Sequence, residues 1–285
     1  MIDDGTWKLL GTVNMVTYGN DISYLIQGDK GAVIQIAGGQ SMLAFYIGNA
    51  NHVEFRDLIF TGSPSQQVYD CQFLILAAYT GRLTVNGCQF FGVLAKDSVI
   101  YSMNVETRIQ DTDFFGCGGL GGVVTGAAPF GSIVVRGAKF IDYGTLRNVY
   151  YSKPGAPSWI NIEDSPDRPV QFLTASVTIE HSRFDEAAPA HIRIKNVPNV
   201  RILNCAHNVS AIDGGKGISL DQVKNGVIAN GAFGWSSSRR PALELINGSF
   251  AKVSGLIFGD AVYFADVDAS SAVNATDCPA CAGRK

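Results

Sequence analysis

The sequence is poor in charged residues, which make up 16% of its 285 residues, against roughly 25% in an average soluble domain. The formal net charge of −3 leaves no basic excess of the kind that binds nucleic acid, so we expect no nucleic-acid partner. No apolar run approaches the roughly 18 residues of a membrane-spanning helix, and we expect no membrane span. A basic segment followed by an apolar one is also missing at the start, so no signal peptide is recognised.

Helical periodicity is missing as well. The apolar residues do not recur at the spacing of about 3.6 residues that an amphipathic helix requires, which counts against the helical repeat proteins. What the sequence has in quantity is 32 glycines and a hydrophobic fraction of 46%. This composition favours strands and tight turns.

The six cysteines are not spaced like a disulfide framework. Cys278 and Cys281 form a single CxxC pair, and a four-cysteine zinc site needs a second pair that this sequence lacks. Cys88 and Cys205 fall at one position of the repeat described next, where small or apolar residues also occur, so we expect them to be buried thiols. We expect neither a metal nor a cofactor.

One short pattern, apolar-x-apolar-x-turn-x-x-Phe, recurs along the chain. Its last positions are Phe60, Phe90, Phe114, Phe140, Phe184, His207, Phe233 and Phe258. Most copies lie about 23 to 30 residues apart, the length of one coil of a β-solenoid. The step from Phe140 to Phe184 is 44 residues, which fits either two coils or one coil with a long insertion.

Two positions of the pattern have a direct structural meaning. The last position predicts an internal ladder of stacked rings, because strands of neighbouring coils lie about 4.8 Å apart. The turn position holds only residue types that tolerate a left-handed backbone, which predicts a tight bend in every coil. The turn residues are Asp57, Gly87, Asp111, Gly137, His181, Asn204, Asn230 and Gly255.

The sequence therefore predicts an all-β fold: a single right-handed parallel β-helix of about eight to ten coils with three parallel sheets. We expect the helix to span residues 1–265 and a C-terminal tail or cap to span residues 266–285. No capping segment is evident at either end, and uncovered strand edges invite pairing. We therefore expect a homo-oligomer, such as a trimer, or contact with other proteins of an assembly.

At the repeated residues the chain resembles the right-handed parallel β-helix superfamily with the pectate-lyase-like fold. That superfamily includes pectate lyases, polygalacturonases, and bacteriophage tailspikes and tail-associated depolymerases. The resemblance covers about residues 5–265 and is carried by structural positions, so it is more specific for the fold than for an activity. It implies that the strand before each copy of the pattern belongs to the sheet that usually carries the ligand.

These implied strands are residues 191–195, 217–221 and 242–246. Their alternation stacks Arg193, Ser219 and Glu244 in one outward column and sets Lys195 beside Asp221, with His191 at a strand start. We expect Asp221, Glu244 and Arg193 as catalytic residues, since a glycosidase needs two carboxyl groups roughly 5 to 9.5 Å apart, and His191 and Lys195 as substrate-binding residues. The alternative is a solvated ladder of charges. The dense carboxylate cluster of a calcium-dependent lyase is missing.

Two connections are expected to overhang this sheet, residues 143–169 and residues 234–241. Aromatic rings with arginines nearby suit carbohydrate recognition, because sugar C–H faces pack on rings and guanidinium groups bind carboxylates. The same aromatic residues could instead anchor a protein interface. The expected substrate-binding residues of the two connections are Tyr150, Tyr151, Trp159, Trp235, Arg239 and Arg240.

These features lead to the hypothesis of a virion-type module, like a bacteriophage tailspike or fibre, that binds a surface polysaccharide and, in one version, degrades it. Such a protein would act in a virion or at a cell surface. Two alternatives stay open. One is a secreted polysaccharide lyase or glycoside hydrolase of the same fold, and the other is a purely structural or adhesive solenoid.

Overall fold

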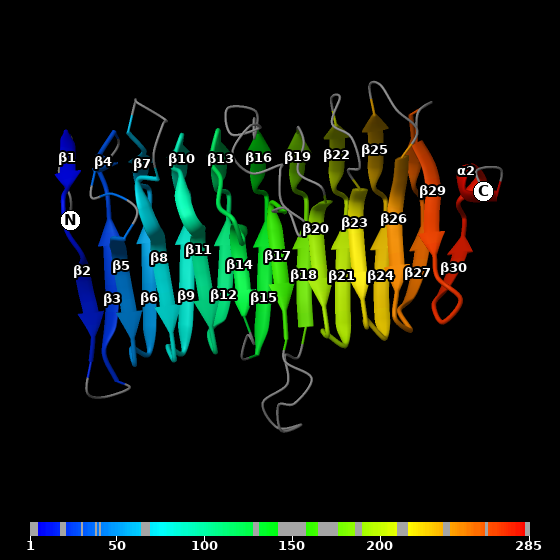
Figure 1. The fold of residues 1–285 in the computed structure, drawn as a ribbon, viewed down its shortest axis with the longest axis horizontal. Helices are drawn as coiled ribbons and strands as arrows, with labels where there is room; N and C mark the ends of the chain where they lie inside the picture. The colour runs from blue at the N-terminus through cyan, green and yellow to red at the C-terminus, as the bar shows by residue number, and fades with distance from the viewer. Residues whose placement is uncertain are drawn as a thin grey trace.

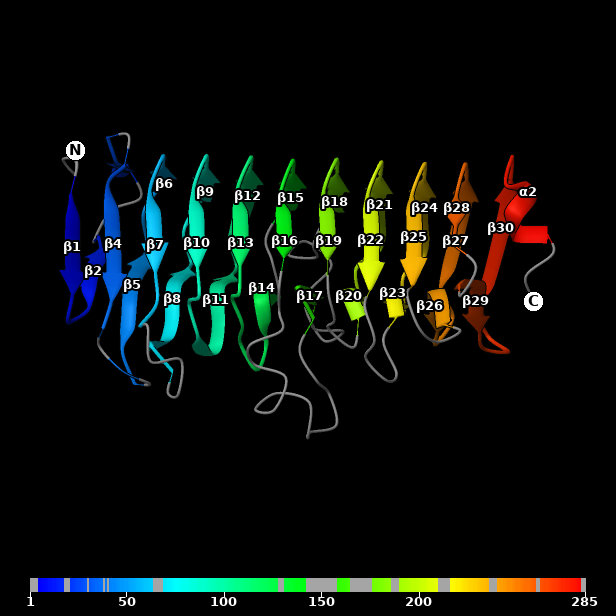
Figure 2. The ribbon, with the colours of Figure 1, turned by 90° about the horizontal axis from the view of Figure 1, so that it is seen from above.

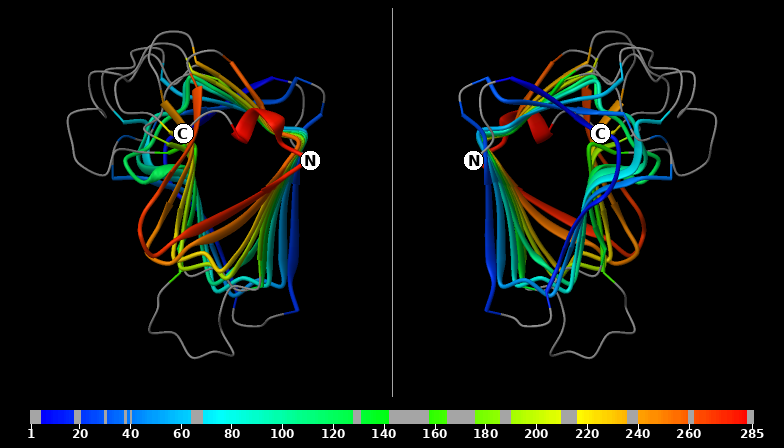
Figure 3. Two further views of the ribbon diagram at one scale, coloured as in Figure 1. Left: turned by 90° about the vertical axis from the view of Figure 1, so that its right-hand side faces the viewer. Right: turned by 90° about the vertical axis from the view of Figure 1, so that its left-hand side faces the viewer.

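The computed structural model describes residues 5–17, 21–29, 31–37, 39, 41–63, 69–127, 131–141, 158–164, 176–185, 190–209, 216–235, 240–259 and 262–282. In this part of the chain the strands form three parallel sheets of ten strands each. Figure 1 shows the strands stacked along the long axis of the molecule, and Figure 3 shows the sheets end-on around one central core.

The first sheet holds the repeated aromatic residue and is called the ladder sheet (Figure 2). Its strands are β1 (Thr6–Leu9), β4 (Val33–Ile36), β7 (Ile59–Thr61), β10 (Gln89–Phe91), β13 (Asp113–Phe115), β16 (Lys139–Ile141), β19 (Arg183–Asp185), β22 (Ala206–Val209), β25 (Ala232–Trp235) and β28 (Ile257–Phe258).

The second sheet contains the strands for which a ligand-binding role was expected, and it is called the site sheet. Its strands are β2 (Val13–Val16), β5 (Leu43–Gly48), β8 (Cys71–Ala78), β11 (Ala95–Met103), β14 (Gly122–Ala127), β17 (Ile160–Glu163), β20 (Ala190–Lys195), β23 (Lys216–Asp221), β26 (Arg240–Ile246) and β29 (Val262–Val267).

The third sheet is formed by the strand that precedes the turn position of each repeat. Its strands are β3 (Ser23–Gln27), β6 (His52–Arg56), β9 (Arg82–Asn86), β12 (Glu106–Gln110), β15 (Ser132–Arg136), β18 (Ser176–Glu180), β21 (Asn199–Leu203), β24 (Asn225–Ala229), β27 (Phe250–Ser254) and β30 (Ala272–Thr276). Each coil thus adds one strand to every sheet, which confirms the predicted parallel β-solenoid.

The aromatic ladder is confirmed. The Phe114 ring stacks between Phe90 at 4.7 Å and Phe140 at 4.9 Å, measured between ring centroids. His207 takes a place in the same ladder and lies 4.6 Å from Phe233, with the two rings nearly parallel. A fully buried Phe side chain contributes roughly 1.5 to 3 kcal/mol by the hydrophobic effect, and each stacked pair adds about 0.5 to 1.5 kcal/mol.

The predicted left-handed bend is also confirmed, since every expected turn residue has a positive φ, as in Asp57 at 55° and His181 at 51°. A second column of left-handed residues, which the sequence analysis did not find, follows the strands of the site sheet. Asparagine dominates it because a short amide side chain tolerates this backbone better than other non-glycine residues. The second column contains Asn49, Tyr79, Asn104, Asn196, Gln222 and Asn247.

The long step in the repeat is one coil with insertions. Phe140 and Phe184 stack directly, with their centroids 5.0 Å apart, and β16 pairs with β19 without an intervening strand. Between them, β17 supplies the site-sheet strand of this coil and pairs with β14 and β20.

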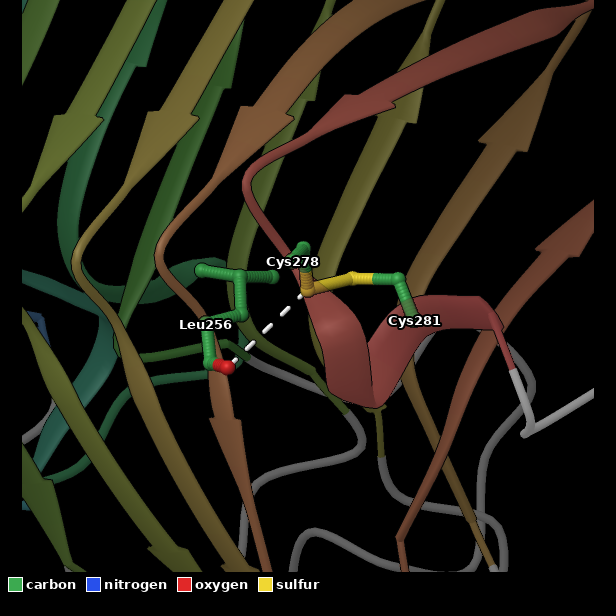
Figure 4. Close-up of a disulfide and its surroundings, with 3 residues drawn as sticks. All are labelled: Leu256, Cys278 and Cys281. Atoms are coloured by element: carbon green, nitrogen blue, oxygen red, sulfur yellow. Dashed lines mark hydrogen bonds between the residues drawn. A yellow bond between two sulfur atoms is a disulfide. The ribbon is translucent and has the colours of Figure 1, made fainter.

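The C-terminal end differs from the expected boundary at residue 265, which falls inside β29. The solenoid continues to Thr276, because β30 pairs with β27 in register. The short helix α2 (Pro279–Ala282) follows, and a disulfide joins Cys278 to Cys281, which is a pairing that the cysteine spacing did not predict. Figure 4 shows the bond beside Leu256, over the end of the last coil. The other four cysteines are buried thiols, which confirms the expectation for Cys88 and Cys205.

The N-terminal end of the solenoid carries exposed apolar side chains. Trp7, Leu10 and Leu25 are 54%, 70% and 53% exposed. They lie at the end of the solenoid where β1, β2 and β3 form the outer edges of the three sheets.

Candidate functional site

One column of outward-facing side chains runs along the site sheet from end to end. Its members are paired strand to strand: Asn14, Tyr46, Leu76, Tyr101, Thr125, Asn161, Arg193, Ser219, Glu244 and Asp266. The register confirms that Arg193, Ser219 and Glu244 share one column and that Lys195 is the neighbour of Asp221. The column is aromatic and apolar toward the N-terminus and polar or charged toward the C-terminus.

At the polar end, Glu244 is held by two donors from the neighbouring strand β23. The Lys216 ammonium forms an ion pair with Oε1, and Ser219 Oγ donates a hydrogen bond to Oε2 at 2.6 Å. The Glu244 side chain is 18% exposed. Both carboxylate oxygens therefore take part in contacts that join β26 to β23.

The neighbouring charges are paired in the same way. Asp221 is buried, and its Oδ1 accepts a hydrogen bond from Asn247 Nδ2 at 2.7 Å. Lys195 Nζ donates to Glu163 Oε1 at 2.8 Å. A catalytic role for Asp221, Glu244 and Arg193 stays a prediction, and so does the alternative of a solvated charge ladder.

Two expected surface residues lie in the core. His191 and Trp159 are each 0% exposed, so the structure corrects their placement as substrate-binding residues. In the central coils, two successive residues near the start of the site-sheet strand are buried, as His191 and Ile192 are. The Trp159 ring packs 5.6 Å from Phe140, and His191 packs against the ladder at Phe184, with centroids 5.9 Å apart.

Other expected residues lie outside the described part of the chain. Tyr150, Tyr151 and Arg239 belong to this group. Trp235 and Arg240 are placed by their backbones alone, with Trp235 in β25 beside Val209 and Arg240 in β26.

The aromatic end of the site sheet carries a cluster of residues that the sequence analysis missed. We call it the Tyr–Asp cluster, and it consists of Tyr69, Gln72, Phe73, Asp97 and Tyr101. The Phe73 and Tyr101 rings come from successive strands and lie 5.0 Å apart at a tilt of 57°. Both side chains are half-buried, so each ring keeps part of its surface toward solvent.

A β-bulge sets the position of Asp97. The register between β8 and β11 shifts between Ala95 and Ser98, so that β11 holds an extra residue there. Bulges often redirect a side chain beside a functional site. Here, Asp97 is half-buried, and its Oδ2 accepts a hydrogen bond from Gln72 Nε2 at 2.8 Å.

The Asp97 carboxylate acts on both tyrosines of the cluster. Burial raises the pKa of Tyr101 and of Tyr69, and the negative charge of Asp97 raises both further. The two phenols therefore stay protonated and can each donate a hydrogen bond, whereas the Asp97 carboxylate can only accept them.

A second acidic residue nearby has a structural role. Asp70 is buried, and its carboxylate accepts hydrogen bonds from the backbone N–H groups of Ser63 at 2.6 Å and Leu94 at 2.8 Å. Burial raises the pKa of Asp70 to about 6, against the two backbone hydrogen bonds, which lower it. Asp70 therefore holds the connection into β8, whereas Asp97 faces the surface.

The signal for this cluster was weak in the sequence. Tyr69 and Phe73 lie in one coil and Asp97 and Tyr101 in the next, and neither pair matches a motif. The sequence analysis proposed site strands only at residues 191–195, 217–221 and 242–246, and so did not consider the residues of β8 and β11. The extra residue of the bulge in β11 also changes the number of residues between equivalent positions of successive coils, so the periodicity does not align these positions.

The described residues contain no group of three or more His, Cys, Asp or Glu side chains placed to hold a metal ion. None of the described helices has the length and hydropathy to cross a membrane. Comparisons with protein-family models, with curated proteins and with solved structures found no match.

Proposed function

We propose that this chain is a polysaccharide-binding β-solenoid that holds a glycan along the outward column of the site sheet. The observation that carries the proposal is the column itself, which offers side chains at the strand spacing of about 4.8 Å along one straight face. A polysaccharide is also a linear repeat, so successive sugars would meet successive strands.

The chemistry of the column suits sugars. The half-buried Tyr101 ring of the column, with the Phe73 ring beside it, can pack against the apolar C–H face of a pyranose. Amide and guanidinium groups follow farther along the column, at Asn161 and Arg193, and groups of these kinds can hydrogen-bond to sugar hydroxyls.

The setting that we propose is a virion-type module, similar to a bacteriophage tailspike or fibre, at work in a virion or at a cell surface. The resemblance of the repeat to the pectate-lyase-like β-helices supports it. The exposed Trp7, Leu10 and Leu25 of the first coil support an oligomer or another protein of an assembly as partner, because exposed apolar side chains favour association.

Binding without cleavage is the version that the contacts favour. Both carboxylate oxygens of Glu244 are engaged by Lys216 and Ser219, and Asp221 is buried beside Asn247. A hydrolase needs one carboxyl group that is free to donate a proton and a second that attacks or activates water. The secreted lyase or hydrolase is therefore the second candidate, with Asp221, Glu244 and Arg193 as its residues.

A glycan array of bacterial capsular and cell-wall polysaccharides, probed with the intact protein, tests the proposal. We expect saturable binding to one structural class of glycan, measured afterwards by calorimetry, and no shortening of the bound glycan on prolonged incubation. Absence of binding across the array would overturn the proposed function. New reducing ends, or new absorbance at about 235 nm from an unsaturated product, would favour the enzyme instead.

A further inference from the structure

We infer that the Tyr–Asp cluster is the subsite that selects the glycan, and that it takes an uncharged sugar residue with adjacent free hydroxyls. This inference rests on the proposed function and narrows it to one end of the site sheet and one class of sugar. The sequence analysis had instead placed the candidate site at the charged, C-terminal end of the site sheet.

The backbone at the cluster departs from a regular strand. The bulge in β11 lifts Asp97 out of the regular alternation, and a glycine-rich segment of the next coil packs closely against it. A Cβ atom on Gly119 would lie only 2.6 Å from the Asp97 carbonyl oxygen, so this close approach requires glycine. The bulge is thus built into the packing of two coils and holds the Asp97 carboxylate in place.

The cluster combines an apolar ring surface with a carboxylate. The tilted Phe73 and Tyr101 rings, 5.0 Å apart, offer an apolar surface at an angle. Asp97 lies beside this surface and is oriented by the Gln72 amide at 2.8 Å. A pyranose lying on the rings would direct ring hydroxyls toward the carboxylate, which accepts charge-assisted hydrogen bonds from adjacent hydroxyl donors.

The charge of Asp97 adds selectivity. A carboxylate accepts hydrogen bonds from the hydroxyls of an uncharged sugar but repels an anionic one, so Asp97 both attracts the first and disfavours the second. Asp70, the other carboxyl group nearby, has both oxygens bonded to backbone N–H groups. Lys96 precedes Asp97 in the bulge and is exposed. Lys96 would strengthen binding of an acidic sugar, and the experiment therefore includes it.

The experiment measures the affinity of the best-binding oligosaccharide of the array, by calorimetry, for five proteins. They are the wild type, Asp97→Asn, Phe73→Leu, Lys96→Ala and Glu244→Gln. For an uncharged ligand at the cluster, Asp97→Asn and Phe73→Leu each weaken binding at least about tenfold. Lys96→Ala changes it less than about twofold, Glu244→Gln weakens it less than Asp97→Asn does, and salt between 50 and 500 mM has little effect.

Two results would overturn the inference while leaving the proposed function intact. One is a best ligand that carries carboxylate or sulfate groups and whose binding is strengthened by Asp97→Asn and weakened by Lys96→Ala. The other is an affinity that Asp97→Asn and Phe73→Leu leave within twofold while Glu244→Gln reduces it. Thermal melts of each variant verify that the fold is retained. No binding to any glycan would remove the proposed function itself.

Discussion

His191 and His207 meet inside the core, with the Nδ1 atoms of their imidazole rings 3.1 Å apart. His207 occupies a position of the aromatic ladder, and His191 lies on the preceding strand of the site sheet, β20. Their rings are nearly parallel, with centroids 5.3 Å apart. Both side chains are buried, so one neutral imidazole donates and the other accepts.

The first prediction concerns acid. Burial lowers the pKa of His191 to about 3, and burial together with the charge of His191 lowers the pKa of His207 well below its usual value. The unfolded chain binds these protons near pH 6.5 and the folded chain does not, so stability is full above about pH 6.5 and falls toward pH 3. Urea midpoints at pH 7.5 and pH 4.5 measure this loss.

The double variant His191→Leu, His207→Phe is the control for this prediction. It gives both positions the residue types that their columns hold elsewhere, and we expect it to lose less stability on acidification than the wild type. Asp70 acts in the opposite direction, because its folded-state pKa of about 6 exceeds its usual value and protonation of Asp70 favours the fold as the pH falls below 6. An equal loss in both proteins would show that the imidazoles do not set the acid sensitivity.

The second prediction concerns the ladder. Phe114→Ala removes a fully buried ring between two stacked neighbours, and we expect a loss of about 3 to 5 kcal/mol in unfolding free energy. The matched variant Phe91→Ala changes an outward ring that is 39% exposed and stacks on Phe115 at 5.1 Å. It should cost markedly less in the same urea titration. Comparable losses would mean that the inner ladder does not carry the stability.

The third prediction concerns the left-handed turns. Asn204 has a φ of 54°, where glycine is unstrained and a residue with a Cβ atom costs roughly 1 to 2 kcal/mol more. We expect Asn204→Gly to leave the thermal midpoint almost unchanged and Asn204→Ala to lower it. If the alanine variant melts with the wild type, this backbone position is not strained for ordinary side chains.

The fourth prediction concerns the disulfide between Cys278 and Cys281, which closes the end of the core near Leu256. A loop of about four residues is short, so the chain-entropy contribution is at most about 2 kcal/mol. We expect Cys278→Ser, Cys281→Ser to speed amide hydrogen exchange in β28 and β30, and to leave exchange in β13 and β16 unchanged. Unaltered exchange at the C-terminal strands would exclude a capping role.

Much of the fold could be predicted from the sequence, because its determinants recur at fixed positions of every coil. The ladder position and the left-handed turn position depend on residue type alone, and both were found where expected. Strand alternation also predicted that Arg193, Ser219 and Glu244 lie in one column, as the register shows. Whether the 44-residue step was one coil or two depended on which strands pair, and only the structure could decide it.

The candidate site was less predictable. His191 was expected at the surface at a strand start and Trp159 in an overhanging connection, but both side chains are buried in the core. The bulge at Asp97 and the meeting of Gln72 with Asp97 join residues of different coils. Sequence periodicity alone thus determined that this chain forms a parallel β-solenoid, since local backbone preferences repeat with every coil. Tertiary structure decided which side chains reach its surface, because that depends on bends, bulges and contacts between coils.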